Sequence, residues 1–309
     1  MLSFQPLLPP LHTGGPEPTG FLYSHWILDP AIAMFIIVLT AAYLIVVGPL
    51  NRRRPGVENR PVSSAQIRWF MAGQLALFVS LGPPLDDWAY YYFSSAHMIQ
   101  HLILMFVVVP AWIKGTPPWI FDPIVHSKRG RFLLTWVPRA VPGFLLASLI
   151  IALWHVPLFY NATLTNELVH ALQHLFFLMA GFLFFWPLMS TVKESPQLSP
   201  PMKSLYLFAQ TIPSGIVGAT IVYAAPPLYP HYAQSTIRPW GLSVADDQVL
   251  GGMFMWVGMN AVFLLMLSII FLRWAGDEDR KERESLTSGQ LRQRIAPVAE
   301  PHGHHQVIS

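Results

Sequence analysis

The chain has 309 residues, of which 53% are hydrophobic and only 11% are charged, and its formal net charge is +3. Soluble domains carry about 25% charged residues, so this deficit excludes an ordinary soluble domain and predicts a membrane protein. The sequence contains no cysteine, which excludes disulfides and thiolate metal sites. Any metal ion must therefore be bound by His, Met, carboxylate or backbone oxygen.

Seven apolar segments predict membrane-spanning helices. A hydrocarbon core of ~30 Å is crossed by about 20 mostly apolar residues in a helix, bounded by charge or by Pro and Gly. In chain order the segments are 31–50, 67–82, 96–113, 142–160, 167–189, 203–224 and 248–272. Segment 67–82 is the shortest. We expect segment 31–50 to serve as the signal for membrane insertion. The sequence thus predicts an all-α polytopic membrane protein, a bundle of seven transmembrane helices.

Basic residues predict the orientation, because Lys and Arg are retained on the cytoplasmic side of a membrane. With seven spans, all 19 Lys and Arg residues except Arg238 fall on one side. We therefore predict that the N-terminus lies outside and the C-terminus in the cytoplasm. Residues 1–30 are expected to form an external segment and 31–273 the seven-helix transmembrane domain. Residues 274–309 are charged and low in aromatics, which predicts a disordered cytoplasmic tail.

Five of the 12 histidines are predicted to lie at one depth, on three different helices. His97 and His101 are four residues apart near the outer end of the third helix, and His170 and His174 repeat this spacing in the fifth. His155 comes just before the outer end of the fourth helix. Residues four apart project from one helix face, at a separation where two imidazoles can share one metal ion. Unpaired polar groups in lipid are costly, so we favour a functional cluster over five separate packing residues.

Thioethers and a carboxylate extend the candidate metal ligands. Met105 continues the stripe of His97 and His101, and Met255 shares the start of the seventh helix with Asp247. Imidazole and thioether without thiolate suit copper, particularly Cu(I), better than they suit magnesium or calcium. The hypothesis is a copper site in the outer half of the membrane.

The same residue types also have structural interpretations. A Met packs anywhere in an apolar core. The aspartate pairs at 86–87 and 246–247 can cap helices or solvate an outer loop, as well as attract a cation. Four glycines are interpreted as points of close helix packing: Gly215, Gly218, Gly251 and Gly252.

Three stretches resemble the motifs of a known family. They are similar to motifs of the CtaG family, the assembly factors of caa-type cytochrome c oxidases, and they read "HMIQHLILM", "ALWHVPLFYNATLTNELVHALQHLFFLMAGFLFFWPL" and "DDQVLGGMFMWVG". The resemblance covers residues 95–272. It implies a seven-helix protein of the bacterial cell membrane that helps mature the oxidase, with copper delivery as its usual proposed role. The matching positions are His97, His101, His155, His170, His174 and Asp247. The expected partners are cytochrome c oxidase subunits and the lipid bilayer, with no nucleic acid and no enzymatic activity.

Three other classes of function stay open at this point. A haem protein would use one His from each of two facing helices as axial ligands. A copper or proton transporter needs polar residues that continue to the cytoplasmic side, and the inner halves "FVVVPAW", "GFLFFWPLM" and "LLMLSIIF" contain few. An intramembrane enzyme needs a base, a nucleophile or a reactive metal-bound water, and the chain has no His-Glu-x-x-His spacing.

Overall fold

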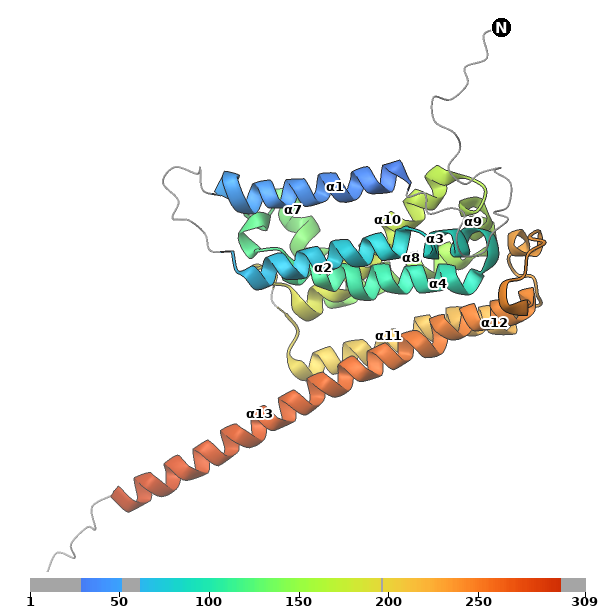
Figure 1. Cartoon of the computed structure of the whole chain (residues 1–309). Coiled ribbons are helices and arrows are strands. Elements are labelled where there is room, and N and C mark those ends of the chain that lie inside the picture. Colours follow the sequence, from blue (N-terminus) through green and yellow to red (C-terminus); the bar gives the residue numbers. More distant parts are fainter. Residues whose placement is uncertain (1–28, 52–61, 196, 296–309) are drawn as a thin grey trace, which may run out of the picture.

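The computed structural model describes residues 29–51, 62–195 and 197–295, and within them it contains helices and connecting segments but no strand. Figure 1 shows the long helices running side by side in one bundle, from which the end of α13 projects. The long elements are α1 (Pro30–Ile45) with the π-helical turn η1 (Val46–Leu50), α2 (Ser64–Leu81), α4 (Ser94–Ile103) continued by η3 (Leu104–Val108) and α5 (Val109–Gly115), α8 (Ala140–His155), α10 (Glu167–Met189), α11 (Pro200–Tyr223), and α12 (Val244–Met253) continued by η8 (Phe254–Gly258) and α13 (Met259–Ile295).

Short elements connect these helices at the two ends of the bundle. They are α3 (Leu85–Asp87), η2 (Trp88–Tyr92), η4 (Pro118–Phe121), α6 (Asp122–His126), α7 (Lys128–Arg131), η5 (Phe132–Trp136), α9 (Pro157–Thr163), η6 (Pro230–Ala233) and η7 (Pro239–Gly241). The all-α class is confirmed, with one correction: the helix predicted over 142–160 is interrupted at the extended Val156, between α8 and α9.

The described part of the chain contains fewer candidate membrane spans than the seven that the sequence predicts. In the described part of the chain, five helices are long and apolar enough to cross a membrane: Pro30–Leu50, Ser94–Gly115, Glu167–Met189, Pro200–Tyr223 and Val244–Thr287. A sixth is obtained if Lys128–Trp136 and Ala140–His155, which meet at 80°, form one span. α2 lies outside this set, and it carries Gln66, Arg68 and Gln74. Seven spans and the orientation of the termini therefore stay predictions.

Local sequence determines where two histidine-bearing helices begin and end. Asn166 caps α10, because its side-chain oxygen accepts a hydrogen bond of 3.1 Å from the N–H of Val169. α8 ends at His155, since Pro157 disfavours a helical conformation at Val156, which is extended (φ −62°, ψ 130°). His155 is therefore the last helical residue of α8.

Glycines allow close contacts between helices. A Cβ atom built on Gly218 of α11 would lie 2.6 Å from the backbone nitrogen of Trp256 and 2.8 Å from the carbonyl oxygen of Gly252. One built on Gly252 would lie 2.9 Å from the backbone nitrogen of Val222. α11 thus packs backbone against backbone on α12 and η8, and the predicted close packing at these two glycines is confirmed.

The C-terminal tail differs from its prediction. α13 continues to Ile295, so residues 274–295 are helical and the predicted disorder is corrected for this part. The segment is rich in Glu, Lys and Arg, which are good helix formers. Two ion pairs of 2.9 Å lie on its exposed surface, one between Asp277 and Arg280 and one between Glu278 and Lys281. The two residues of each pair are three positions apart, about one helical turn. Residues 296–309, like residues 1–28 of the predicted external segment, lie outside the described residues.

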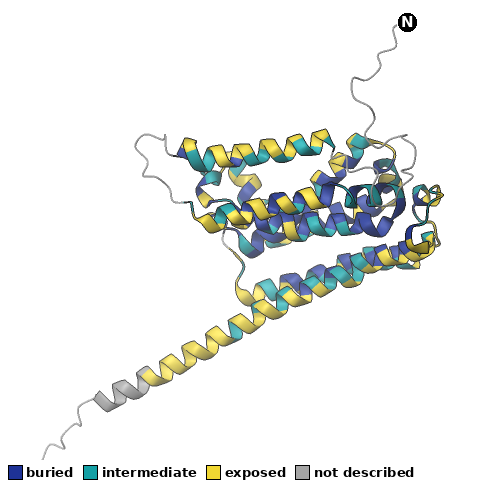
Figure 2. Cartoon of the chain, in the orientation of Figure 1, coloured by how far each residue is buried: buried dark blue, intermediate teal, exposed yellow. Residues whose placement is uncertain are grey.

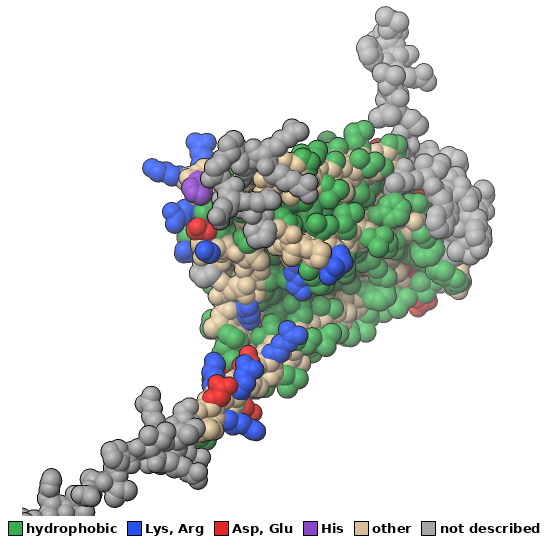
Figure 3. Space-filling model, turned by 60° about the vertical axis from the view of Figure 1, so that its left-hand side comes forward, with side chains coloured by type: hydrophobic (Ala, Val, Ile, Leu, Met, Phe, Trp, Pro, Cys, Tyr) green, Lys and Arg blue, Asp and Glu red, His purple; other side chains and the backbone are tan. Residues whose placement is uncertain are grey.

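The surface of the bundle suits a lipid environment. Figure 2 shows exposed residues along the outward faces of the long helices, and these include Leu145, Ile216 and Leu265, which are 58%, 63% and 61% exposed. In Figure 3, the Lys and Arg side chains gather at the end of the bundle from which α13 leaves, while the face beyond them is mostly hydrophobic. Apolar side chains on this scale are stable on a surface that contacts lipid.

Candidate metal centre

α4 holds His97 and His101 on one face and in the interior. Their ring centroids are 4.4 Å apart, and the two residues are 0% and 1% exposed. The start of α4 is held by Asp247 of α12, whose carboxylate accepts hydrogen bonds from the backbone N–H groups of Ser94 at 2.7 Å and Ser95 at 3.2 Å. A negative charge is favourable at a helix N-terminus. Asp247 thereby anchors the helix that carries both histidines.

The second pair of histidines, on α10, faces the first. The rings of His170 and His174 are 4.4 Å apart, the ring of His170 lies 5.4 Å from that of His97, and the ring of His174 lies 6.1 Å from that of His101. His155, at the end of α8, has its ring 5.9 Å from that of His101. The structure thus brings all five predicted histidines together.

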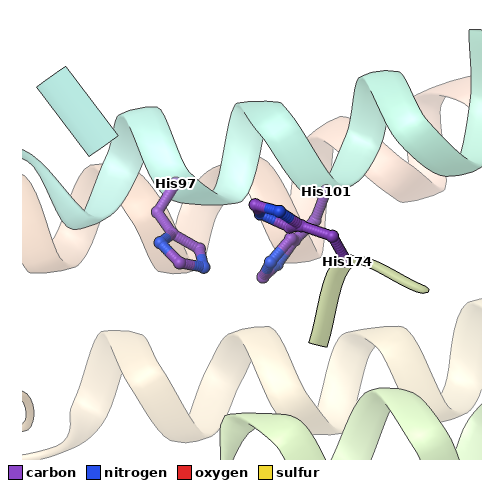
Figure 4. Close-up of side chains that lie close together, drawn as sticks. All are labelled: His97, His101 and His174. Carbon is purple, nitrogen blue, oxygen red and sulfur yellow. The ribbon is translucent and has the colours of Figure 1, made fainter. Parts of the chain in front are cut away.

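Three of these residues form a compact group of nitrogen atoms, which we call the triad: His97, His101 and His174. Each offers one ring nitrogen, and the three nitrogens lie within 4.8 Å of one another. Figure 4 shows the three rings directed toward one another, two from α4 and one from α10. Nitrogens bound to one ion at about 2 Å lie at most about 4 Å apart. A small side-chain movement therefore brings all three within reach of one ion.

The hydrogen bonding of the triad leaves lone pairs available. Nε2 of His97 lies 3.1 Å from Oε1 of Gln173, and with Nε2–H as the donor the lone pair of His97 is on Nδ1. Among the described residues, Nδ1 of His97, both ring nitrogens of His101 and Nε2 of His174 have no hydrogen-bond partner. Buried polar atoms are normally hydrogen-bonded. Each neutral imidazole holds one lone pair, so buried ring nitrogens that converge without other partners can bind a cation.

His155 lies beside the triad but has different contacts. Its Nδ1 is 2.7 Å from the carbonyl oxygen of Ile151, and its Nε2 is 3.3 Å from Sδ of Met98. Met98 is completely buried. Sequence reasoning did not select Met98, although it lies inside the "HMIQH" motif.

The remaining predicted ligands lie in distinct surroundings. Both carboxylate oxygens of Asp247 also accept hydrogen bonds from the hydroxyls of Ser94 and Ser95, at 2.8 and 2.5 Å. We therefore treat Asp247 as a helix anchor, and its role as a ligand stays a prediction. Met105 packs at the crossing with Gly181, and Met255 is buried in the main hydrophobic core. For these two residues the ligand role stays a prediction.

Two glutamines were missed by the sequence analysis. Gln173 contacts His97, and Gln100 donates hydrogen bonds of 2.8 Å to the carbonyl oxygen of Ser80 and to Oδ1 of Asp86. Each glutamine directly precedes the second histidine of a pair. The repeated pattern His-x-x-Gln-His, in residues 97–101 and 170–174, was the available signal.

A pocket of about 340 Å³ between α1 and α10 reaches the histidines from one end of the bundle. Its acidic and histidine lining comes from Asp29, Asp86, Glu167, His170 and His174. Glu167, His170 and His174 lie on one face of α10, because residues spaced by three or four share a helix face. Because His174 is part of its lining, the pocket reaches the edge of the triad.

Tyr90 of η2 also lines this pocket. Its hydroxyl donates a hydrogen bond of 3.1 Å to the carbonyl oxygen of Leu164. Burial, and then the nearby Tyr91 and Glu167, raise the pKa of Tyr90 to about 12. The phenol stays protonated at neutral pH and keeps this hydrogen bond.

The chain is similar to proteins of several mycobacteria. An uncharacterized protein of Mycobacterium leprae is 23% identical over 283 residues, which cover 86% of this chain and 42% of that protein. Uncharacterized proteins of Mycobacterium bovis and Mycobacterium tuberculosis are each 24% identical over 277 residues, covering 82% of this chain and 40% of theirs. The chain spans about two fifths of the length of these relatives. No solved structure matches it.

A family comparison covers most of the transmembrane region. The model of the cytochrome c oxidase caa3 assembly factor family matches residues 41–277, which contain α2 to α12, all five clustered histidines and Asp247. This range exceeds half of the chain and includes the motifs that resembled the family. The chain therefore belongs to the cytochrome c oxidase caa3 assembly factor (CtaG) family.

Proposed function

We propose that the protein binds copper at the triad of His97, His101 and His174 and helps to deliver it to cytochrome c oxidase. The observation that carries this proposal is the convergence of three ring nitrogens within 4.8 Å, in residues whose buried ring nitrogens include several without a hydrogen-bond partner in the described chain. Imidazole is a favourable ligand for copper. Membership of an oxidase assembly factor family supports copper as the cargo.

The orientation in the membrane is part of the proposal. We place the protein in the bacterial cell membrane with seven spans, the N-terminus outside and the C-terminus in the cytoplasm. The gathering of Lys and Arg at the α13 end of the bundle supports this orientation. The triad lies toward the opposite end, near the starts of α4 and α10, where it is accessible to a partner on the outer side.

The packing around the triad favours an ion over the haem alternative. The ring of His101 stacks on Phe177 with centroids 3.7 Å apart, and Tyr160 lies 5.0 Å from His97. A porphyrin between facing histidines needs an open slot as wide as the macrocycle, and these side chains fill the space. An ion at the centre of three nitrogens needs no such slot.

The inner half of the bundle supports a carrier rather than the transporter alternative. Beyond the triad, Met105, Phe184 and Phe263 are buried in an apolar core. A cation moving through such a core would lose its ligands and its hydration. We therefore propose a non-catalytic role in which copper is received and released on one side of the membrane.

Metal analysis of the protein purified in mild detergent, with and without added copper, tests the proposal. We expect the wild type to retain copper and the His101→Gln and His174→Gln variants to lose it, because Gln keeps polarity but removes the imidazole. Leu265→Ala, at a 61% exposed position of α13, is the matched control and should retain copper. Equal copper content in all four proteins would contradict the proposed site.

A further inference from the structure

Met98 of α4 and His155 of α8 face each other next to the triad. Sδ of Met98 lies 3.3 Å from Nε2 of His155, and the two residues are 0% and 6% exposed. The nature of this contact depends on which ring nitrogen of His155 carries the hydrogen.

The contact made by Nδ1 of His155 shows which ring nitrogen carries the hydrogen. Nδ1 of His155 lies 2.7 Å from the carbonyl oxygen of Ile151, and a carbonyl oxygen only accepts hydrogen bonds. Nδ1 therefore carries the hydrogen, and in a neutral imidazole Nε2 then holds a lone pair. A thioether has no hydrogen to donate. An imidazolium, which would donate to both atoms, is costly in this buried aromatic environment. The contact thus joins two lone-pair atoms, without a hydrogen between them.

The fold holds this arrangement in place. The hydroxyl of Tyr229 donates a hydrogen bond of 3.0 Å to the carbonyl oxygen of His155, and Tyr229 stacks on Tyr160 at 3.7 Å. The ring of His155 is therefore held by the carbonyl oxygen of Ile151, and the backbone of His155 is held by the hydroxyl of Tyr229. Hydrogen bonds of this kind orient the ligands of metal sites.

We propose that Sδ of Met98 and Nε2 of His155 form a second binding position for Cu(I), beside the triad. The proposal rests on the proposed function, because it takes copper as the ion that reaches this region. Ligand bonds of about 2.0 Å to nitrogen and 2.3 Å to sulfur allow two ligands of one ion to lie up to about 4.3 Å apart. The observed 3.3 Å is within that limit.

The chemistry of the pair points to the oxidation state. A thioether is a soft ligand, which selects Cu(I) over harder ions. The ring centroid of His155 is only 5.9 Å from that of His101. An ion at the new position therefore has an imidazole of the triad as its neighbour.

X-ray absorption at the copper edge of the Cu(I)-loaded protein in mild detergent tests this position. We expect the wild type to show a sulfur shell near about 2.3 Å in addition to nitrogen. Met98→Leu, which conserves the volume of the side chain, should lose the sulfur shell and keep the nitrogen shell. Met259→Leu removes another buried thioether, which lies in the main hydrophobic core and is not a predicted ligand, and it should keep both shells.

The outcomes separate this inference from the proposed function. A wild-type spectrum with nitrogen alone, or a sulfur shell that persists in Met98→Leu, overturns the Met98–His155 position and leaves copper binding by the triad intact. A wild-type protein that binds no copper overturns both. A wild-type spectrum without a sulfur shell overturns the position whether or not the variant folds.

Discussion

The carboxylate of Asp247 accepts two hydrogen bonds from Ser94, a residue 153 positions earlier in the chain, at 2.7 Å from its N–H and 2.8 Å from its hydroxyl. This contact joins the start of α12 to the start of α4, about one turn before His97. Asp247 is 3% exposed, so its hydrogen bonds are shielded from competing water. The position of both histidines on α4 thus depends on a residue of another helix.

Replacing Asp247 by Asn is expected to destabilise the protein by about 1–3 kcal/mol, because a buried charge-assisted hydrogen-bond network is lost. Copper retention should fall as well, since α4 loses its anchor. Thermal unfolding in detergent measures the first effect. Asp246→Asn is the control, because Asp246 is exposed and its carboxylate accepts a hydrogen bond from the hydroxyl of Ser243 at its own helix cap. Equal stability of the two variants would exclude the anchoring role.

Replacing His101 by Leu should leave the copper-free protein as stable as the wild type or more stable. Both ring nitrogens of His101 are buried without a partner in the described chain, and an apolar side chain removes that cost. The variant should, however, lose the stabilisation that copper confers, about 2.7 kcal/mol when copper is 100-fold above its Kd. Unfolding curves with and without copper check both effects. A copper-dependent shift that persists in the variant would argue against His101 as a ligand.

In cells, replacing His174 by Gln should lower cytochrome c oxidase activity while the protein still accumulates. Excess copper in the medium should restore part of the activity by mass action. Oxidase activity and protein level are measured together, with Leu265→Ala as the control. If His174→Gln leaves oxidase activity intact at a normal protein level, the histidines serve packing alone.

Filling the pocket between α1 and α10 should slow copper loading without changing the amount bound at equilibrium. Ala171 lines the pocket, so Ala171→Trp occupies part of its volume of about 340 Å³. Leu172, the next residue of α10, is 41% exposed and lies outside the pocket lining, which makes Leu172→Trp the control. Loading is followed by transfer of Cu(I) from a coloured chelator. Equal loading rates would show that copper reaches the triad by another path.

Reporter fusions check the orientation of the chain. Fusions after Arg131 and Lys281 should report a cytoplasmic location, and a fusion at Asn161 should report an external one. The reason is that a basic cluster is translocated across the membrane poorly. An external signal from the Arg131 fusion would reverse the topology and move the triad to the cytoplasmic side.

Helical periodicity made the paired histidines predictable. His97 with His101, and His170 with His174, had to share a face, because a spacing of four depends only on the local geometry of a helix. The interruption after His155 was not predicted, since 142–160 was expected to be one helix, although Pro157 explains the extended conformation of Val156. The disorder predicted for residues 274–295 was wrong because good helix formers and local ion pairs extend α13 beyond the apolar span.

The sequence by itself determined the all-α class, the positions of the long helices and the two histidine pairs, since each depends on hydrophobicity or spacing within one segment. Only the tertiary structure decided which lone pairs converge. The contact of Met98 with His155 and the hydrogen bonds of Asp247 with Ser94 join segments 57 and 153 residues apart. Such contacts depend on how each helix is rotated about its axis and how closely it packs on its neighbours, which local spacing does not specify.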